Sequence, residues 1–205
     1  MELKVVEFEG KNLEEVKAKA LEELEVTEED ILFKSEEKKG KLFKSATTIL
    51  KVVTIKDVAE FLKASLSELV GNMGIDVKLE TSIRDQQINL KMYSDKNNIL
   101  IGKNGQTLSA IQNILRQQVY NVIGKYPYIL LDVENYKEKK INNLERMAKR
   151  VAKEVSKTKI EVILDDMNSY ERRIIHNALG DFKNITTISE GEEPHRHIII
   201  KYKED

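Results

Sequence analysis

The stretch "NILIGKNGQTLSAIQNIL", which occupies Asn98–Leu115, contains the four residues Gly102-Lys103-Asn104-Gly105. Glycine lacks a Cβ atom, so a Gly-x-x-Gly loop lets its backbone approach another chain closely. The apolar spacing after Gly105 predicts a helix, and the unpaired N–H groups and positive dipole at a helix start favour anions. Lys103 adds a cation and Asn104 a neutral donor. The stretch therefore predicts a loop that holds phosphate groups.

A second Gly-x-x-Gly, Gly71-Asn72-Met73-Gly74, lies nearby in the sequence. A predicted helix that begins at Thr54 stops there, and glycine commonly supplies the left-handed residue that ends a helix. Because the chain has 9 glycines, one chance pair at this spacing is expected. We interpret the second motif as a helix terminus only.

The elements predicted around the first motif follow the order helix, strand, strand, short helix, loop, helix, strand. They are expected, in turn, at residues 54–73, 75–79, 88–92, 95–101, 106–123 and 128–133. Apolar side chains flank the loop and are expected to offer a surface for bases: Ile99, Leu100, Ile101 and Leu108.

The composition excludes several classes of function. The 34 Lys and Arg residues nearly cancel the 35 Asp and Glu residues, and cysteine is absent. Disulfides, thiolate metal sites and Cys nucleophiles are therefore excluded. The first residues, MELKVVEFEG, lack the apolar core of a signal peptide, and no apolar run approaches the roughly 18–20 residues of a membrane span. We expect a cytoplasmic protein without a membrane span.

Residues 1–53 predict a small β-α-β-β module. Asn12 and Glu15 have the spacing of a capping box at the start of its helix. About fifty residues bury little surface alone, so we expect an accessory module. Its parts are a strand at 3–8, a helix from 13, a strand at 31–33, the charged turn "KSEEKKGK" at 34–41 and a strand at 47–53.

The region Tyr136–Lys159 predicts a long helix with a basic side. It holds nine Lys or Arg residues and three Glu residues, with apolar residues at helical spacing. Such a charge run is usually a solvated face, but a local cationic surface can also bind phosphate. Both interpretations stay open, and Lys149 and Lys153 are candidates under the second.

The stretch "NSYERRIIHNAL", Asn168–Leu179, predicts a further helix. Asn168 and Glu171 have capping spacing, and Arg172 and His176 lie four residues apart on one face.

Residues 54–134, with their element order and the sequence "IGKNG", resemble a type II KH domain of order α-β-β-α-α-β. In that family the Gly-x-x-Gly loop clamps about four nucleotides of a single strand and the bases lie in an apolar groove. The resemblance implies RNA contacts by Ile101, Gly102, Lys103, Asn104 and Gly105. Asn104 takes a place where such loops often carry a basic residue. A Walker A loop would need Ser or Thr after Gly-Lys, and "GKNGQT" has Asn there.

Residues 135–205, with "NSYERRIIHNAL" and "SEGEEPHRHIII", resemble the single-stranded nucleic-acid-binding α/β domain named for its Arg-x-x-x-His motif. The basic helix would lead into this domain. The resemblance implies phosphate or base contacts by Arg172, His176 and Arg196, with Arg173 as a further candidate.

The order of the three parts resembles the bacterial Jag family, also called KhpB, over essentially the whole chain. The resemblance implies an α+β protein of three small domains, residues 1–53, 54–134 and 135–205. It also implies a single-stranded RNA-binding protein, acting as an RNA chaperone or post-transcriptional regulator linked to cell elongation, envelope synthesis or sporulation. A small single-KH protein is the implied partner. The family often has a Gly-rich turn where this chain has "KKGKLFKS", so the role of the first module transfers least securely.

Other classes of function have less support in the residues. His176, His195 and His197 lack a cysteine or a well-spaced carboxylate to complete a zinc site, so we expect no metal and no cofactor. No Ser/His/Asp order stands out, so we expect no enzyme. Single-stranded DNA stays open as a ligand, because nothing in these residues reads the 2′-hydroxyl. A protein-interaction adaptor that uses the KH frame to form a homodimer is the alternative.

Overall fold

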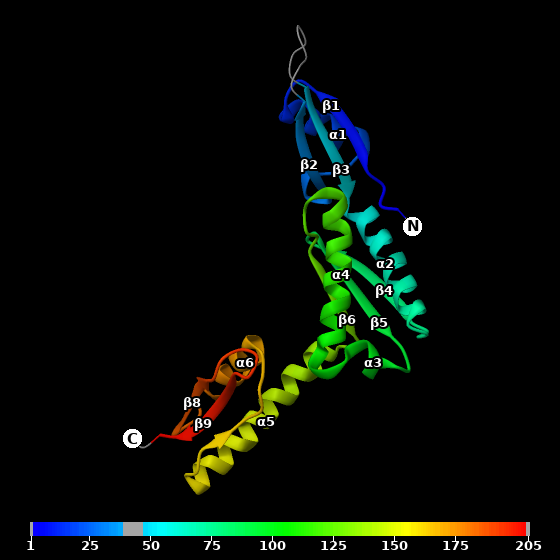
Figure 1. Ribbon diagram of the computed structural model, residues 1–205. Coiled ribbons are helices and arrows are strands. Elements are labelled where there is room, and N and C mark those ends of the chain that lie inside the picture. Colours follow the sequence, from blue (N-terminus) through cyan, green and yellow to red (C-terminus); the bar gives the residue numbers. More distant parts are fainter. Residues whose placement is uncertain (1, 39–46, 204–205) are drawn as a thin grey trace. The chain divides into compact units, whose positions relative to one another are not determined.

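The computed structural model describes residues 2–38 and 47–203, and its α+β fold confirms the class predicted from the sequence (Figure 1). The chain divides into two compact units, Met1–Glu134 and Asn135–Asp205. The first unit contains both the N-terminal module and the KH-like frame, and the second contains the long helix and the Arg-x-x-x-His region.

The N-terminal module is an antiparallel sheet of strand order β1-β3-β2 with helix α1 packed against it. Val16 and Ala20 of α1 are buried against Phe8 of β1 and Leu50 of β3. The side chain of Asn12 accepts a hydrogen bond from the N–H three residues on, at 2.9 Å, and so fixes the start of α1. The elements are β1 (Val6–Gly10), α1 (Leu13–Leu24), the 3₁₀ helix η1 (Glu28–Asp30), β2 (Ile31–Lys38) and β3 (Thr47–Thr54).

Strand β2 is longer than the sequence predicts. The charged turn expected at residues 34–41 was wrong for its first part, because β2 stays paired with β3 as far as Lys38, opposite Thr47. Backbone pairing does not require apolar side chains, and the side chains of residues 34–38 are exposed. The rest of that expected turn, from Lys39 on, lies outside the described residues.

The KH-like frame follows β3 without a linker, since Thr54 both ends β3 and caps α2 by accepting a 3.0 Å hydrogen bond from the N–H of Asp57. In the sheet of order β4-β5-β6, the β4–β5 pair is antiparallel and the β5–β6 pair is parallel. Ile88, Leu90 and Met92 of β5 are fully buried beneath the helices. The predicted order is confirmed by α2 (Ile55–Asn72), β4 (Lys78–Arg84), β5 (Gln87–Tyr93), α3 (Asn97–Ile101), the 3₁₀ helix η2 (Lys103–Gly105), α4 (Gln106–Ile123) and β6 (Ile129–Val133).

The second unit packs two helices on an antiparallel sheet of order β7-β9-β8. Ala152 of α5, Ile175 of α6 and Ile198 of β9 meet in its core. A capping box between Asn168 and Glu171 starts α6, as the sequence predicts. The elements are α5 (Tyr136–Thr158), β7 (Val162–Ile163), α6 (Ser169–Leu179), β8 (Ile185–Glu190) and β9 (His197–Tyr202).

Candidate nucleic-acid interface

The Gly-x-x-Gly loop joins α3 to α4 through left-handed backbone angles. Gly102 has φ 69° and ψ −178°, Asn104 has φ 55° and Gly105 has φ 85°. A Cβ atom on Gly102 would lie 2.1 Å from Thr107 Oγ1 and 3.0 Å from the Thr107 backbone N. Glycine is therefore required at position 102 if α4 is to begin where it does.

Lys103 and Asn104 form the exposed tip of this loop, whereas Gly105 is buried. Lys103 forms no ion pair with any residue that the structure describes. Helix α4 begins without a side-chain hydrogen bond at its N-cap. The amide groups of its first turn, its dipole and the Lys103 ammonium thus favour the same ligand, an anion.

The apolar residues beside the loop divide into two groups. Ile99 is 48% exposed and Ile101 is half-buried, so both offer apolar surface next to the loop. Leu100 and Leu108, which were expected on the same surface, are instead buried in the core. The expected base-contacting surface is therefore narrower than the sequence predicts.

The second Gly-x-x-Gly has no comparable geometry. Gly71 lies within α2, and an added Cβ there would meet no atom within 4 Å. Gly74 has φ 71° just after the helix, which is the terminating role predicted for it. The two motifs thus differ in structure as the sequence analysis proposes.

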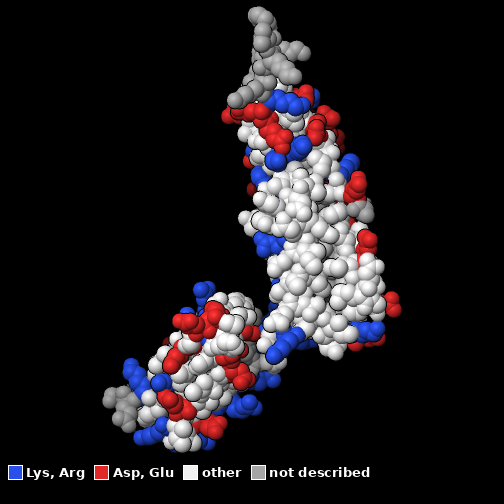
Figure 2. All heavy atoms as spheres, in the orientation of Figure 1, with Lys and Arg blue, Asp and Glu red and all other residues white. Residues whose placement is uncertain are grey.

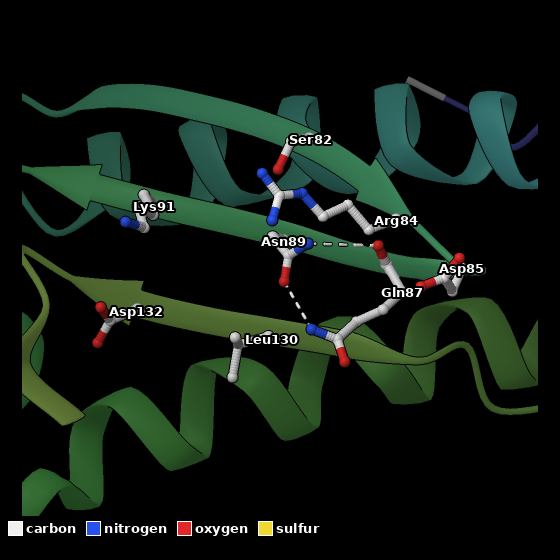
Figure 3. A pocket seen from close by; sticks show the side chains of 8 residues that line it. All are labelled: Ser82, Arg84, Asp85, Gln87, Asn89, Lys91, Leu130 and Asp132. Carbon is white, nitrogen blue, oxygen red and sulfur yellow. Dashed lines mark hydrogen bonds between the residues drawn. The ribbon is translucent and has the colours of Figure 1, made fainter. Parts of the chain in front are cut away.

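The sheet face opposite the helices carries a shallow polar depression of about 480 Å³ (Figure 3). Gln87 Nε2 donates a 2.6 Å hydrogen bond to Asn89 Oδ1 at its centre. Its cations and acids balance, so it lacks the positive bias of the loop. The lining residues are Ser82, Arg84, Asp85, Gln87, Asn89, Lys91, Leu130 and Asp132.

Most cations of α5 lie on the side of the helix away from the core of the second unit, whereas Lys140 pairs with the buried Glu171 of α6. Ala148, Ala152 and Val155 are fully buried, while Lys149 and Lys153 are exposed and four residues apart. Neither lysine forms an ion pair with a described residue. The same holds for the exposed side chains of Arg146, Arg150 and Lys157.

Arg172 and His176 both form hydrogen bonds within the second unit. Arg172 is 7% exposed; its Nη1 donates to the carbonyl of Met167 at 2.6 Å and its Nη2 to Glu193 Oε1 at 2.8 Å. His176 is half-buried, with Nδ1 2.5 Å from Thr187 Oγ1 on β8. The family resemblance implies nucleic-acid contacts by both side chains. In the structure their hydrogen bonds connect α6 to the loop before β9 and to β8.

The other two arginines of the motif region differ from Arg172. Arg173 is exposed and forms no ion pair with a described residue. Arg196 is half-buried, and its Nε donates to Ser189 Oγ at 3.0 Å. Arg173 is thus the member of the group that is most accessible to a phosphate.

Residues 2–38 and 47–203 contain neither a metal-binding cluster nor a helix that could span a membrane. No group of three His, Asp or Glu side chains there is arranged to hold a metal ion. In the same ranges, every helix is too short or too polar to cross a bilayer.

Each of the two units contains a domain that matches a known family. Residues 59–121 match the KH domain of KhpA/KhpB, and residues 142–202 match the domain named for its Arg-x-x-x-His motif. An RNA-binding protein KhpB from Clostridium symbiosum is 38% identical over 203 residues, which cover 96% of this chain and 90% of that protein. The chain belongs to the KhpB family.

Other members of the KhpB family align with the whole chain or with most of it. An RNA-binding protein KhpB from Bacillus subtilis (strain 168) is 32% identical over 202 residues, covering 95% of this chain and 96% of that protein. One from Streptococcus pneumoniae (serotype 2, strain D39) is 28% identical over 154 residues, covering 74% of this chain and 47% of that protein. The resemblance drawn from the sequence motifs is confirmed.

Proposed function

We propose that this protein binds single-stranded RNA and catalyses no reaction. The Gly102–Gly105 loop is the observation that carries the proposal, because its glycine-framed backbone presents Lys103 and Asn104 to solvent beside a helix start that lacks a side-chain cap. Relatives in the KhpB family that are named RNA-binding proteins support RNA as the anionic ligand. Ile99 and Ile101 would contact the bases of the clamped nucleotides.

We assign a separate RNA contact to the second unit. Lys149, Lys153 and Arg173 would bind phosphates, because their exposed cations have no ion-pair partner among the described residues. Arg172 and His176 would act as positioning residues that hold α6 in place. Arg196 would contact RNA only through the part of its side chain that solvent reaches.

The loop assignment is tested with the double variant Lys103→Asp, Asn104→Asp in the full chain. Aspartate tolerates the left-handed angle of Asn104, so the fold should persist while the charge at the tip changes by −3. Fluorescence anisotropy should show single-stranded RNA affinity reduced by about tenfold or more, and parental binding should weaken steeply with salt. Duplex RNA should bind the parent more weakly than a single strand.

A matched control makes the same charge change elsewhere. Lys63→Asp with Ser67→Asp alters the exposed side of α2 by −3. This control should bind RNA like the parent. An equal loss of RNA affinity in both double variants would show a general effect of charge. If the loop variant binds RNA as tightly as the parent, the loop does not clamp the strand.

The cellular role we propose is that of a cytoplasmic RNA chaperone or post-transcriptional regulator, linked to cell elongation, envelope synthesis or sporulation, with a small single-KH protein as partner. Sequencing of RNAs crosslinked in cells, with the loop variant as control, would identify its targets. Protein partners that survive RNase treatment in a pull-down would instead favour an adaptor.

A further inference from the structure

An exposed aromatic pair lies at the far end of α4 from the Gly-x-x-Gly loop. The rings of Tyr120 and Tyr126 stack with centroids 4.4 Å apart and an interplanar angle of 18°. They are nevertheless 39% and 50% exposed. The guanidinium carbon of Arg116 lies 5.3 Å from the centroid of the Tyr126 ring, and the Tyr126 hydroxyl donates to Gln117 Oε1 at 3.3 Å. These contacts fix an aromatic surface that solvent reaches.

Side chains along one stripe of α4 lie between this tyrosine pair and the Gly102–Gly105 loop. Gln112, Arg116 and Tyr120 recur every four residues and are at least partly exposed, so their side chains are neighbours along the second half of α4. Gln112 Oε1 accepts a 3.1 Å hydrogen bond from the backbone N of Leu131, which places this stripe beside β6. At about 1.5 Å per residue, the tyrosine pair lies about 20 Å along the helix from the loop.

The segment that contains the loop, α4 and the tyrosine pair has no acidic residues. No Asp or Glu occurs from Lys96 to Leu131, where the cations are Lys96, Lys103, Arg116 and Lys125. The face of α4 visible in Figure 2 is accordingly almost entirely white, while acidic atoms gather over other elements. A phosphate backbone could therefore follow α4 without meeting negative charge from this segment.

Arg116 has hydrogen-bonding capacity that the protein does not use. Its Nε atom is buried and has no hydrogen-bond partner among the described residues. Buried donors of this kind are nearly always satisfied, and a guanidinium offers five N–H groups in a fixed plane. An arginine with an unused donor beside an exposed aromatic ring fits a ligand that brings both phosphate and a planar base.

The N-terminal module borders the same end of α4. Lys125 Nζ lies 3.9 Å from the centroid of the Phe33 ring on β2. Lys34 on the same strand forms a 2.8 Å ion pair with Glu36, which offsets that carboxylate. The module thus adds a cation–aromatic contact next to this end of α4.

We infer that single-stranded RNA leaving the Gly102–Gly105 loop runs along this stripe and stacks bases on the exposed side of Tyr120 and Tyr126. Arg116 and Lys125 bind its phosphates there. The inference rests on the proposed function and extends the site beyond the about four nucleotides that a KH loop holds. Base–aromatic stacking tolerates any sequence, so the added contact raises affinity rather than selectivity.

The test compares two lengths of unstructured oligouridylate on full-length Tyr126→Ala. An oligonucleotide of about four nucleotides fills the loop alone, and one of about twelve also reaches the tyrosines. The variant should bind the longer one about fivefold or more weakly and the shorter one like the parent. The parental chain has no tryptophan, so Tyr126→Trp adds a single reporter whose fluorescence the longer oligonucleotide alone should quench.

Tyr128→Ala is the matched control. Tyr128 is 69% exposed, but its carbonyl accepts from the N–H of Ile88, and strand alternation directs its side chain to the sheet face that includes Leu130. It should bind both lengths like the parent. Parental binding of the longer oligonucleotide by Tyr126→Ala, equal weakening at both lengths, or an equal loss in Tyr128→Ala would each overturn the inference. If one of these results is found while the Lys103→Asp, Asn104→Asp variant still loses RNA binding, the tyrosine contact is excluded and the proposed role of the Gly102–Gly105 loop remains supported.

Discussion

Replacing Gly102 with alanine should destabilise the first unit far more than an ordinary glycine substitution. At φ 69° and ψ −178° an L-residue is strained by about 1–3 kcal/mol. The new Cβ would also lie 2.1 Å from Thr107 Oγ1 and 3.0 Å from the Thr107 backbone N, and overpacking of this kind costs about 1–3 kcal/mol. Together these give a loss of about 2–6 kcal/mol in the free energy of unfolding.

The assay is urea unfolding of the full chain followed by circular dichroism, with the transition of residues 1–134 compared between variants. Gly71→Ala is the internal control, because it makes the same substitution in the other Gly-x-x-Gly. Gly71 lies within α2 with open space around it, so alanine there should stabilise by about 0.5–1 kcal/mol.

A second substitution separates the two causes. Thr107→Ala in the Gly102→Ala background removes the nearest clashing atom but leaves the backbone angle and the contact with the Thr107 N. It should recover part of the lost stability and not all of it. If Gly102→Ala unfolds at the parental urea concentration, the loop does not depend on glycine geometry and the reasoning fails.

Three further predictions concern the second unit. Arg172→Met should lower its stability by about 1–3 kcal/mol in thermal unfolding, because charged hydrogen bonds inside the unit are lost, with under about twofold change in RNA affinity while folded. Lys149→Glu with Lys153→Glu should reduce the salt slope of RNA binding by about 1.4, measured by anisotropy over a salt series. Lys140→Met should cost about 2–3 kcal/mol, because the buried Glu171 carboxylate loses its ion pair in a site that is only partly shielded from solvent. Burial lowers the pKa of Lys140, but Glu171 and Tyr136 raise it, and the overall pKa lies above 10.5. The parent should therefore be more stable than Lys140→Met below pH 10.5, and this difference in the free energy of unfolding should shrink as the pH rises further.

The element order could be predicted from the sequence because its signals are local. Thr54, Asn168 and Gly124 lie at helix ends and act within one turn, so the sequence alone locates those ends. The extent of β2 could not be predicted, since the residues up to Lys38 belong to a strand only through pairing with β3, and the sequence does not show how far that pairing continues. A charged, exposed strand leaves no apolar alternation to detect.

Some features of the candidate site could likewise be predicted from the sequence, and others depend on tertiary packing. Exposure of Lys103 follows from its place between two glycines, which is visible in the sequence. The burial of Leu108 depends on which side of α4 meets the sheet, and apolar spacing alone does not distinguish a core stripe from a binding surface. The stacking of Tyr120 on Tyr126 could not be predicted, because Tyr120 lies in the helix and Tyr126 follows it, and only the turn at Gly124 brings the rings together.

In the Arg-x-x-x-His region, the arginine of the motif is buried and the arginine next to it is exposed. Two basic side chains four residues apart share one helix face, and in α6 that face contacts β8 and the loop before β9. A buried guanidinium is stable there because a carbonyl and the Glu193 carboxylate satisfy its donors. The neighbouring Arg173, one residue on, turns by about 100° around the helix and so becomes the exposed cation. We therefore expect position on the helix, rather than membership of the motif, to decide which arginine binds phosphate. Arg173→Met should weaken RNA binding more than Arg172→Met does, and the reverse order in anisotropy titrations would return the role to the motif.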